Sequence, residues 1–438
     1  MFEKTLDISK FLLAVSSINS LADPVLSNHN YRVAYISFLI ARKLTYNNEF
    51  LSNVIVAGLL HDIGLLLLTP PDHILLVKNP EEEESEKLHL HAEVGYKLLK
   101  GFPLFSKAAL AIRYHHLSFK DYVEHKGIKP YSSQVLHVAD RIDVFVSAKL
   151  EGKEPCGEIP YLLPKLEEHL LKLAQKRIID GKLVELFLDE IAPKEAFWFE
   201  LFNEAYLKES LESYLSNFAM KLPFEAFYEL SQILAYLIDF KSPFTATHSS
   251  GVSQTATALA SLFNFSSPDL KKMKVAGLLH DIGKVATPKE ILEKTTRLNN
   301  YERSIIKTHV YYSYKILTKL ELEKNIVEWA AYHHETLDGK GYPFKLKARE
   351  LPLGSRIMAV ADIFTALMED RPYKRGLSLL KAVRVLDALA DANKLDKRIV
   401  RTLKNNLKAI ETGRRAAQER AQKVYDALRE VVSQFKCS

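Results

Sequence analysis

The chain of 438 residues contains very little cysteine. Its two cysteines, Cys156 and Cys437, are far apart and lie outside every recurring pattern in the sequence. Two isolated thiols exclude a cysteine metal site, and they fit the reducing cytoplasm. We therefore expect a cytoplasmic protein whose chemistry depends on other side chains.

Long apolar runs are also missing. No stretch approaches the ~18 apolar residues that a membrane-spanning helix needs. The first residues, Met-Phe-Glu-Lys-Thr-Leu-Asp, have neither a basic start nor a cleavage site. The sequence therefore predicts no membrane span and no signal peptide.

The third absence is that of strand patterns. There is no strand-period segment, no alternation of strands with helices and no glycine-rich phosphate loop. Apolar residues instead recur at helical spacing, for example over 162–188 and 196–215. We expect an all-α fold, and the chain length suggests two or three domains.

Net positive charge is missing except at the end of the chain. From Lys397 to Ser438 there are 11 Lys/Arg and 4 Asp/Glu, a net charge of +7, although the whole chain carries only +6. The body of the protein is therefore not a basic platform for nucleic acid, and nucleic acid is disfavoured as a partner.

The basic C-terminal segment itself is predicted to be helical from about Arg398 to Phe435. Its apolar residues follow a 4-3 spacing that Arg414 interrupts, and Gly413 beside it is a candidate for a kink or a division. A narrow, alanine-rich seam suits close packing, either on the body of the protein or against a second copy in a homodimer.

What the sequence does have is the stretch Gly277-Leu-Leu-His-Asp-Ile-Gly-Lys284. An apolar run leads into adjacent His280 and Asp281, and Gly283 would permit a bend after them. Imidazole and carboxylate side by side can hold a divalent cation, and the carboxylate can bridge two. Lys284 adds a cation, which suits a phosphoryl substrate. The structural alternatives are a core histidine with a capping aspartate, and a lysine at a solvated helix end.

The same stretch occurs earlier in the chain, at Gly58–Gly64, and the polar residues around it repeat as well. Seven positions recur at a separation of 218 to 222 residues. The pairs are His29/His248, His61/His280, Asp62/Asp281, His91/His309, His115/His333, His116/His334 and Asp140/Asp362. The chain is therefore a tandem duplication. We expect domains at 1–215 and 216–396, followed by the basic helix at 397–438.

The second repeat uses all five of its histidines in this pattern. With Asp281 and Asp362 they make seven candidate ligands, more than one cation needs. Two divalent metal ions bridged by Asp281 are the economical arrangement. Imidazole and carboxylate ligands without thiolate suit iron, manganese or zinc, and iron or manganese is favoured.

The chain resembles the HD superfamily of metal-dependent phosphohydrolases, and its second repeat resembles the HD-GYP branch. The resemblance is carried by His280-Asp281-Ile-Gly-Lys284, by His333-His334-Glu335 with Gly341-Tyr342-Pro343, by Arg356 to Asp362 and by Asp370-Arg371-Pro372-Tyr373-Lys374. It implies an all-helical domain that hydrolyses cyclic di-GMP to the linear dinucleotide or to GMP.

The resemblance also implies roles for individual residues. One metal would take His248, His280, Asp281 and Asp362, and the other Asp281, His309, His333 and His334. Lys284 would meet the scissile phosphate, while Tyr342, Arg371 and Lys374 would hold the ligand. As alternatives, Tyr342 is a loop anchor, and Arg371 and Lys374 are surface charges.

Three positions near the ligands need separate comment. Some family members have a glutamate for a third metal where this chain has Phe244, so we expect two metals. Thr336 replaces the arginine that usually follows His-His-Glu. Glu335 is expected to orient a neighbouring histidine rather than to bind metal.

The first repeat keeps the seven ligand positions but has Leu65 in place of Lys284 and no Gly-Tyr-Pro. We expect it to bind metal at His29, His61, Asp62, His91, His115, His116 and Asp140 without hydrolysing cyclic di-GMP. The alternative is a purely structural role, in which these side chains satisfy one another.

The leading hypothesis is thus a cyclic di-GMP phosphodiesterase. The rivals are a phosphohydrolase of another nucleotide or hybrid cyclic dinucleotide, and a non-catalytic sensor of a cyclic dinucleotide.

Overall fold

The computed structural model describes most of the chain. The described residues are 6–22, 28–45, 47–67, 86–124, 127, 129–150, 152–216, 221–239, 247–370 and 375–437. They fold into two compact units, one of Asp7–Met220 with Leu428–Ser438 and one of Met1–Leu6 with Lys221–Ala427. The domain limits expected from the sequence, at residues 215 and 396, stay predictions.

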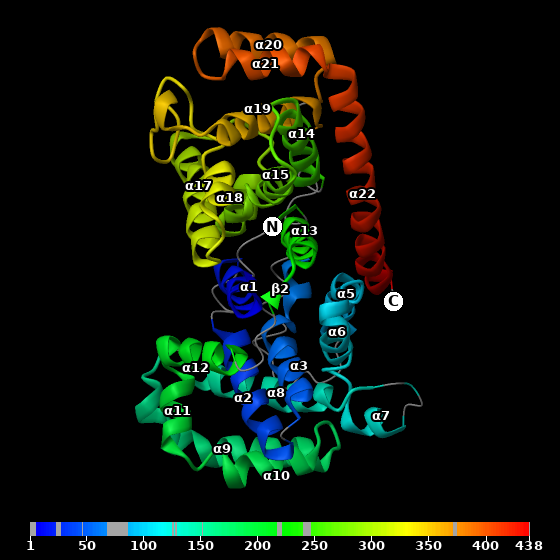
Figure 1. Ribbon diagram of the computed structural model, residues 1–438. Helices are drawn as coiled ribbons and strands as arrows, with labels where there is room; N and C mark the ends of the chain where they lie inside the picture. The colour runs from blue at the N-terminus through cyan, green and yellow to red at the C-terminus, as the bar shows by residue number, and fades with distance from the viewer. Residues whose placement is uncertain are drawn as a thin grey trace. The chain divides into compact units, whose positions relative to one another are not determined.

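The first unit is helical (Figure 1). Its helices are α1 (Ile8–Ala22), α2 (His29–Leu44), α3 (Asn48–Leu60), η2 (Ile63–Leu67), α5 (Glu86–Leu99), η3 (Pro103–Phe105), α6 (Ser106–Arg113), α7 (Phe119–Glu124), α8 (Ser132–Leu150), α9 (Pro155–Gln175), α10 (Gly181–Glu190), α11 (Glu195–Leu201) and α12 (Glu204–Ser216). The apolar segments at 162–188 and 196–215 are each divided between two helices. The first division lies at Arg177, which has a positive φ of 57°, and Asp180 then caps α10.

The second unit repeats the order of the ligand-bearing helices. It contains α13 (Phe224–Asp239), α14 (His248–Leu262), α15 (Ser267–Leu279), η4 (Ile282–Ala286), α16 (Lys289–Leu292), α17 (Asn300–Lys319), α18 (Lys324–Ala331), η5 (Ala348–Glu350), α19 (Leu353–Met368), α20 (Leu379–Asp391), α21 (Lys397–Asn405) and the start of α22 (Leu407–Cys437). The other described elements are two strands of two residues, β1 (Leu6–Asp7) and β2 (Lys221–Leu222). The expected all-α fold with tandem helical domains is confirmed.

The His-Asp pair lies at the same structural junction in both units. Helices α3 and α15 begin with side-chain caps, from Asn47 and Ser266, and they end at His61 and His280. A short 3₁₀ helix follows each pair. The ligand pair is therefore held where a buried helix changes direction.

Close backbone packing explains the glycines around this junction. A Cβ atom at Gly277 would lie 2.5 Å from the Cα of Ser253, and one at Gly283 only 1.9 Å from the carbonyl oxygen of His309. Gly283 does not have a positive φ. The close approach of η4 to α17 therefore requires glycine at 283, rather than a left-handed bend.

The C-terminal region differs from the single helix expected from the sequence. The region is divided into two helices at Asn406 and not at Gly413. The side-chain amide of Asn406 donates a hydrogen bond to the carbonyl oxygen of Thr402 at 2.9 Å. Gly413 lies inside α22 and faces Gln254. Arg414, which the sequence suggested as an interruption of the apolar seam, does not face solvent. It is buried and forms an ion pair with Glu411 at 2.7 Å. None of the described helices is both long and apolar enough to cross a bilayer.

Candidate metal centres

Five helices or their ends bring the seven candidate residues of the second unit together. The residues are His248 at the start of α14, His280 and Asp281 after α15, His309 in α17, His333 and His334 after α18, and Asp362 in α19. Two subsets have ligand atoms within 4.8 Å of one another, and these are His248/His280/Asp281 and His309/His333/His334. The structure therefore gathers every ligand position expected from the sequence.

Asp281 lies between the two subsets. Its Oδ2 is 3.2 Å from His280 Nε2, whereas its Oδ1 is 3.2 Å from His309 Nε2. On the first side, Asp362 Oδ1 lies 3.2 Å from His248 Nε2. One carboxylate thus presents a separate oxygen to each group of imidazoles, which is the geometry of a bridging ligand.

The backbone sets the orientation of three of these imidazoles. The Nδ1 atoms of His280, His309 and His333 lie 2.8, 2.5 and 2.6 Å from the carbonyl oxygens three residues earlier. Each Nδ1 therefore carries the donated hydrogen and leaves the Nε2 lone pair facing inward. These three Nε2 atoms are buried without a hydrogen-bond partner. Buried lone pairs that converge in this way fit a bound cation.

Burial keeps two of the imidazoles, His333 and His334, neutral. It lowers the pKa of His334 to about 3, and the pKa of His333 also lies well below its usual range. Burial would raise the pKa of Asp281, but His280 and Lys284 outweigh it and hold that pKa well below the ordinary value. Neutral imidazoles beside an ionised carboxylate form a donor set suited to divalent metals.

A third carboxylate, Glu369, supports the cluster from outside. Glu369 accepts a hydrogen bond from His248 Nδ1 at 2.8 Å, and this carboxylate was not among the residues expected from the sequence. Burial would lower the pKa of His248, but Glu369 and Asp362 raise it, to about 10. Such carboxylate–histidine pairs fix the ring orientation of a ligand.

The C-terminal helix extends this chain of hydrogen bonds. Gln418 of α22 donates from Nε2 to Glu369 Oε1 at 2.5 Å. The Gln418 side-chain oxygen accepts from Arg414, which is held in turn by Glu411. A continuous set of contacts therefore runs from α22 to His248.

Lys284 lies beside the Asp281 carboxylate, in the neighbourhood that the sequence predicted. Its Nζ donates to Asp281 Oδ2 at 2.5 Å, and 19% of its side chain is exposed. Tyr342 is close as well, with its ring centroid 4.9 Å from that of His334 and the Lys307 Nζ 5.3 Å from its own ring. A cation and an aromatic ring thus lie next to the cluster, at Asp281 and at His334.

Glu335 does not orient a histidine, so that expectation was wrong. Its carboxylate accepts three backbone N–H groups, from Phe344 at 2.7 Å, Lys345 at 3.1 Å and Leu346 at 3.0 Å. It is therefore the anchor of the loop that carries Tyr342. Arg371, Lys374 and Phe244 lie outside the described residues.

The first unit assembles its seven positions with similar geometry. The residues are His29, His61, Asp62, His91, His115, His116 and Asp140, and they form overlapping groups with ligand atoms within 4.8 Å. Asp62 Oδ2 is 3.3 Å from His61 Nε2, and its Oδ1 is 3.4 Å from His91 Nε2. Asp62 therefore lies between two groups of imidazoles, as Asp281 does.

Two side chains make the first cluster different. Arg141 is buried, and its Nη2 lies 3.2 Å from Asp140 Oδ2 and 3.4 Å from His116 Nδ1. The position of Lys284 is taken by buried Leu65. A protein cation therefore already contacts two of the candidate ligands, and the first unit has no counterpart of Lys284 at residue 65.

The outer carboxylate also has a counterpart in the first unit. Asp143 accepts from His29 Nδ1 at 2.7 Å, and Arg32 Nε donates to it at 2.5 Å. The sequence repeat did not reveal this pair of carboxylates, because Thr365 stands at the position of Asp143 and Ser147 at that of Glu369. The carboxylate has moved by one helical turn between the units.

The comparisons with known proteins agree with this internal duplication. Two family models, both described as HD domain, match residues 26–144 and 232–399. Each match includes one complete set of seven candidate ligands.

Characterised relatives are phosphodiesterases. The 3'3'-cGAMP-specific phosphodiesterase 1 of Vibrio cholerae is 29% identical over 389 residues, which are 86% of this chain and 87% of the relative. The cyclic di-GMP phosphodiesterase of Thermotoga maritima is 34% identical over 205 residues, 44% of this chain and 54% of the relative.

A solved structure has the same fold. The crystal structure of a cyclic GMP-AMP-specific phosphodiesterase from Vibrio cholerae has a TM-score of 0.60 at 21% identity, and the match covers 92% of this chain and 98% of that one. At this identity the likeness concerns the fold alone.

Proposed function

Because this chain belongs to the HD superfamily of metal-dependent phosphohydrolases, we propose that its second HD domain hydrolyses a phosphodiester bond of a cyclic dinucleotide. The characterised relatives that match both domains or the second one support the substrate class. The metal-binding chemistry of the clusters supports the reaction class.

The observation that carries the proposal is the juxtaposition of Asp281 and Lys284. Asp281 offers one oxygen to each of two imidazole groups, while Lys284 Nζ lies 2.5 Å from the same carboxylate and is partly open to solvent. A phosphate drawn to a cation centre at Asp281 would therefore come within reach of the Lys284 ammonium group.

The cofactor in this proposal is a pair of divalent metal ions, with iron or manganese as the candidates. One ion would be held by His248, His280, Asp281 and Asp362, and the other by Asp281, His309, His333 and His334. When bound, two such cations supply an activated water and neutralise charge on phosphate oxygens.

The chain's own residues would position the substrate. Lys284 would donate to a non-bridging oxygen of the scissile phosphate and stabilise the charge that grows there. Tyr342 would stack on a guanine base from the loop that Glu335 anchors, with Arg371 and Lys374 as further ligand contacts. In the overall reaction, the water oxygen bonds to phosphorus, one ribose–phosphate P–O bond breaks, and a water proton passes to the departing ribose oxygen.

Two substrates are candidates. The HD-GYP-like residues of the second domain favour cyclic di-GMP, with the linear dinucleotide or GMP as product. The relative that matches 86% of this chain is specific for 3'3'-cGAMP, which makes the hybrid dinucleotide the second candidate. Both contain guanine and the same type of phosphodiester bond.

We propose a regulatory or packing role for the first HD domain. Arg141 neutralises Asp140 there, and Leu65 cannot hold a phosphate as Lys284 can. We also propose that the seven candidate ligands of this domain bind metal. The lysine in the second centre favours hydrolysis over a sensor that only binds the dinucleotide.

The experiment compares matched variants of the two domains. The protein is purified without oxygen, its metals are determined, and cyclic di-GMP and 3'3'-cGAMP are followed separately by chromatography. Asp281→Ala should lose at least about 10³-fold in turnover, because it removes the shared ligand, and should bind less metal. Asp62→Ala, the equivalent change in the first domain, should stay within a few-fold of the parent. Full turnover in Asp281→Ala protein would refute the proposal.

A further inference from the structure

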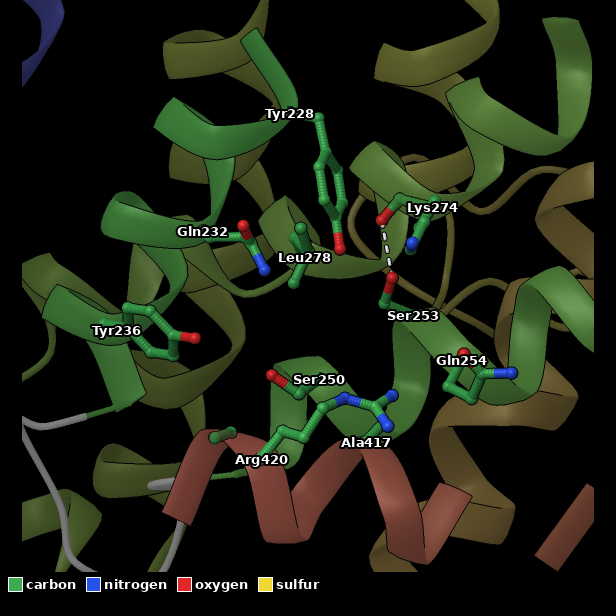
Figure 2. A pocket seen from close by; sticks show the side chains of 11 residues that line it. Tyr228, Gln232, Tyr236, Ser250, Ser253, Gln254, Lys274, Leu278, Ala417 and Arg420 are labelled. Carbon is green, nitrogen blue, oxygen red and sulfur yellow. Dashed lines mark hydrogen bonds between the residues drawn. The ribbon is translucent and has the colours of Figure 1, made fainter. Parts of the chain in front are cut away.

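A cavity of about 150 Å³ lies in the second unit, outside the metal cluster. Helices α13, α14, α15 and α22 all contribute to its walls. Figure 2 shows the polar ends of Tyr228, Gln232, Tyr236 and Ser250 directed into one space, with Arg420 on the wall formed by α22. The cavity therefore joins the C-terminal helix to the helices that carry His248 and His280.

The polar lining consists of groups that can donate hydrogen bonds. Its described lining residues offer the guanidinium of Arg420, the ammonium of Lys274, two phenols, two serine hydroxyls and glutamine amides, and none of them is a carboxylate. Burial raises the pKa of Tyr236, and Tyr228 and Asp239 add to this effect against Arg420, so the phenol keeps its proton. This inventory suits an acceptor-rich ligand.

The positive charges of the cavity are not neutralised by neighbours. Among the described residues, neither Arg420 nor Lys274 forms a side-chain ion pair, although four other cations of α15 and α22 do so. Lys274 Nζ instead lies 4.4 Å from the ring centroid of Tyr228. Two uncompensated cations at one cavity favour an anion.

The volume limits the size of that anion. A cavity of about 150 Å³ can hold a molecule of benzene's size, whereas pockets for drug-sized ligands measure ~300–1,000 Å³. A cyclic dinucleotide is too large for it, but a tetrahedral oxyanion fits. Several donors around one small space match the many acceptor sites of a phosphate.

We propose that this cavity binds a phosphate group, either as free inorganic phosphate or as the end of a small phosphate monoester. The site is separate from the metal centre and does not depend on the proposed hydrolysis. Its ligand would connect Arg420 of α22 with Lys274 of α15 and with the phenols of α13.

Such a ligand would act next to the support of His248. Ser250 at the cavity wall follows His248 by two residues on α14, and Arg420 follows Gln418 by two residues on α22. Gln418 donates to Glu369, which in turn accepts from His248. Binding would therefore hold α22 in the position where it supports the outer carboxylate of the metal centre.

The test is calorimetric titration of the metal-loaded full chain with inorganic phosphate. Lys274→Gln combined with Arg420→Gln should weaken binding at least about tenfold, because two charge-assisted contacts are lost. Lys423→Gln removes a neighbouring cation of α22 and should leave the affinity unchanged. Lys284→Gln weakens the phosphate contact proposed at the metal centre, and the affinity of the cavity should stay unchanged in this variant. Melting curves of all variants check their folding.

Titrations with inorganic phosphate and with glycerol phosphate test the proposal and distinguish the two sources of the phosphate group. Equal binding of inorganic phosphate and glycerol phosphate, both lost in the double variant, supports a site for monoester ends. Binding of inorganic phosphate alone, lost in the same way, supports a site for the free ion. The proposal is overturned if no titrant binds at millimolar concentration, if the double variant keeps the parent's affinity, or if Lys284→Gln abolishes binding.

Discussion

The two HD domains have the same seven candidate ligands but place their cations differently. In the second domain, Lys284 contacts the bridging carboxylate from the partly open side. In the first domain, buried Arg141 contacts Asp140 and His116, and Leu65 fills the lysine position. We therefore expect the two centres to differ in chemistry although their candidate ligands are arranged in a similar way. In the proposed function, the cation of the second domain binds substrate, and the cation of the first domain competes with a metal.

The strongest way to test this comparison is to remove the substrate-facing cation. Lys284→Ala should lower turnover about 10²–10³-fold, because the phosphate loses a donor at the point where charge develops, while the bound metal stays unchanged. Rates and metal content are measured on the same preparation. Lys324→Ala, whose side chain is 84% exposed in the same unit, is the matched control and should behave as the parent does. Parent-like rates in Lys284→Ala protein would contradict the assigned role.

The next test concerns the outer carboxylates. Glu369→Gln removes the charge that faces His248 Nδ1, and we expect metal affinity of the second centre to fall about 10–100-fold. Competition with a chelator measures that affinity. Asp143→Asn is the counterpart in the first domain and should leave turnover within a few-fold of the parent. A larger loss of turnover from Asp143→Asn than from Glu369→Gln would reverse the ranking of the two centres.

The smallest expected effect comes from removing the competing cation of the first domain. Ile363 stands at the position of Arg141 in the second repeat, so Arg141→Ile makes the first centre resemble the second one. We expect the first centre to bind divalent metal about tenfold more tightly, since Asp140 and His116 lose a positive neighbour.

The titration is done in Asp281→Ala protein, in which the second centre is weakened. Arg141→Lys, which keeps the charge, should bind metal as its parent does. Identical metal affinity in the Arg141→Ile and Arg141→Lys proteins would show that the arginine does not compete with metal.

The ligand positions were predictable from the sequence because they repeat with their neighbours. The helical fold was predictable as well, since apolar residues recur at helical spacing and no strand pattern competes. The outer carboxylates were not, because Asp143 and Glu369 occupy different turns of their helices and so break the register of the repeat.

Three features of the C-terminal region were not predicted from the sequence. Gln418 reaches Glu369 from a helix that follows the last ligand in the sequence, and nothing in its local pattern marks it. The division at Asn406 was missed because its side chain ends α21 by bonding the Thr402 carbonyl, whereas Gly413 only suggested a break. Arg414 was taken as an interruption of the seam because only the fold shows that Arg414 and Glu411, its partner three residues earlier, are both buried.

The most direct measurement of the division of labour is a crystal structure of the metal-loaded protein with a hydrolysis-resistant phosphorothioate analogue of cyclic di-GMP. We predict that the analogue binds to the second domain, with its scissile phosphate next to Asp281 and within hydrogen-bonding distance of Lys284 Nζ. The first domain should bind no analogue. An analogue seated at Asp62 in the first domain, with the second centre empty, would contradict it.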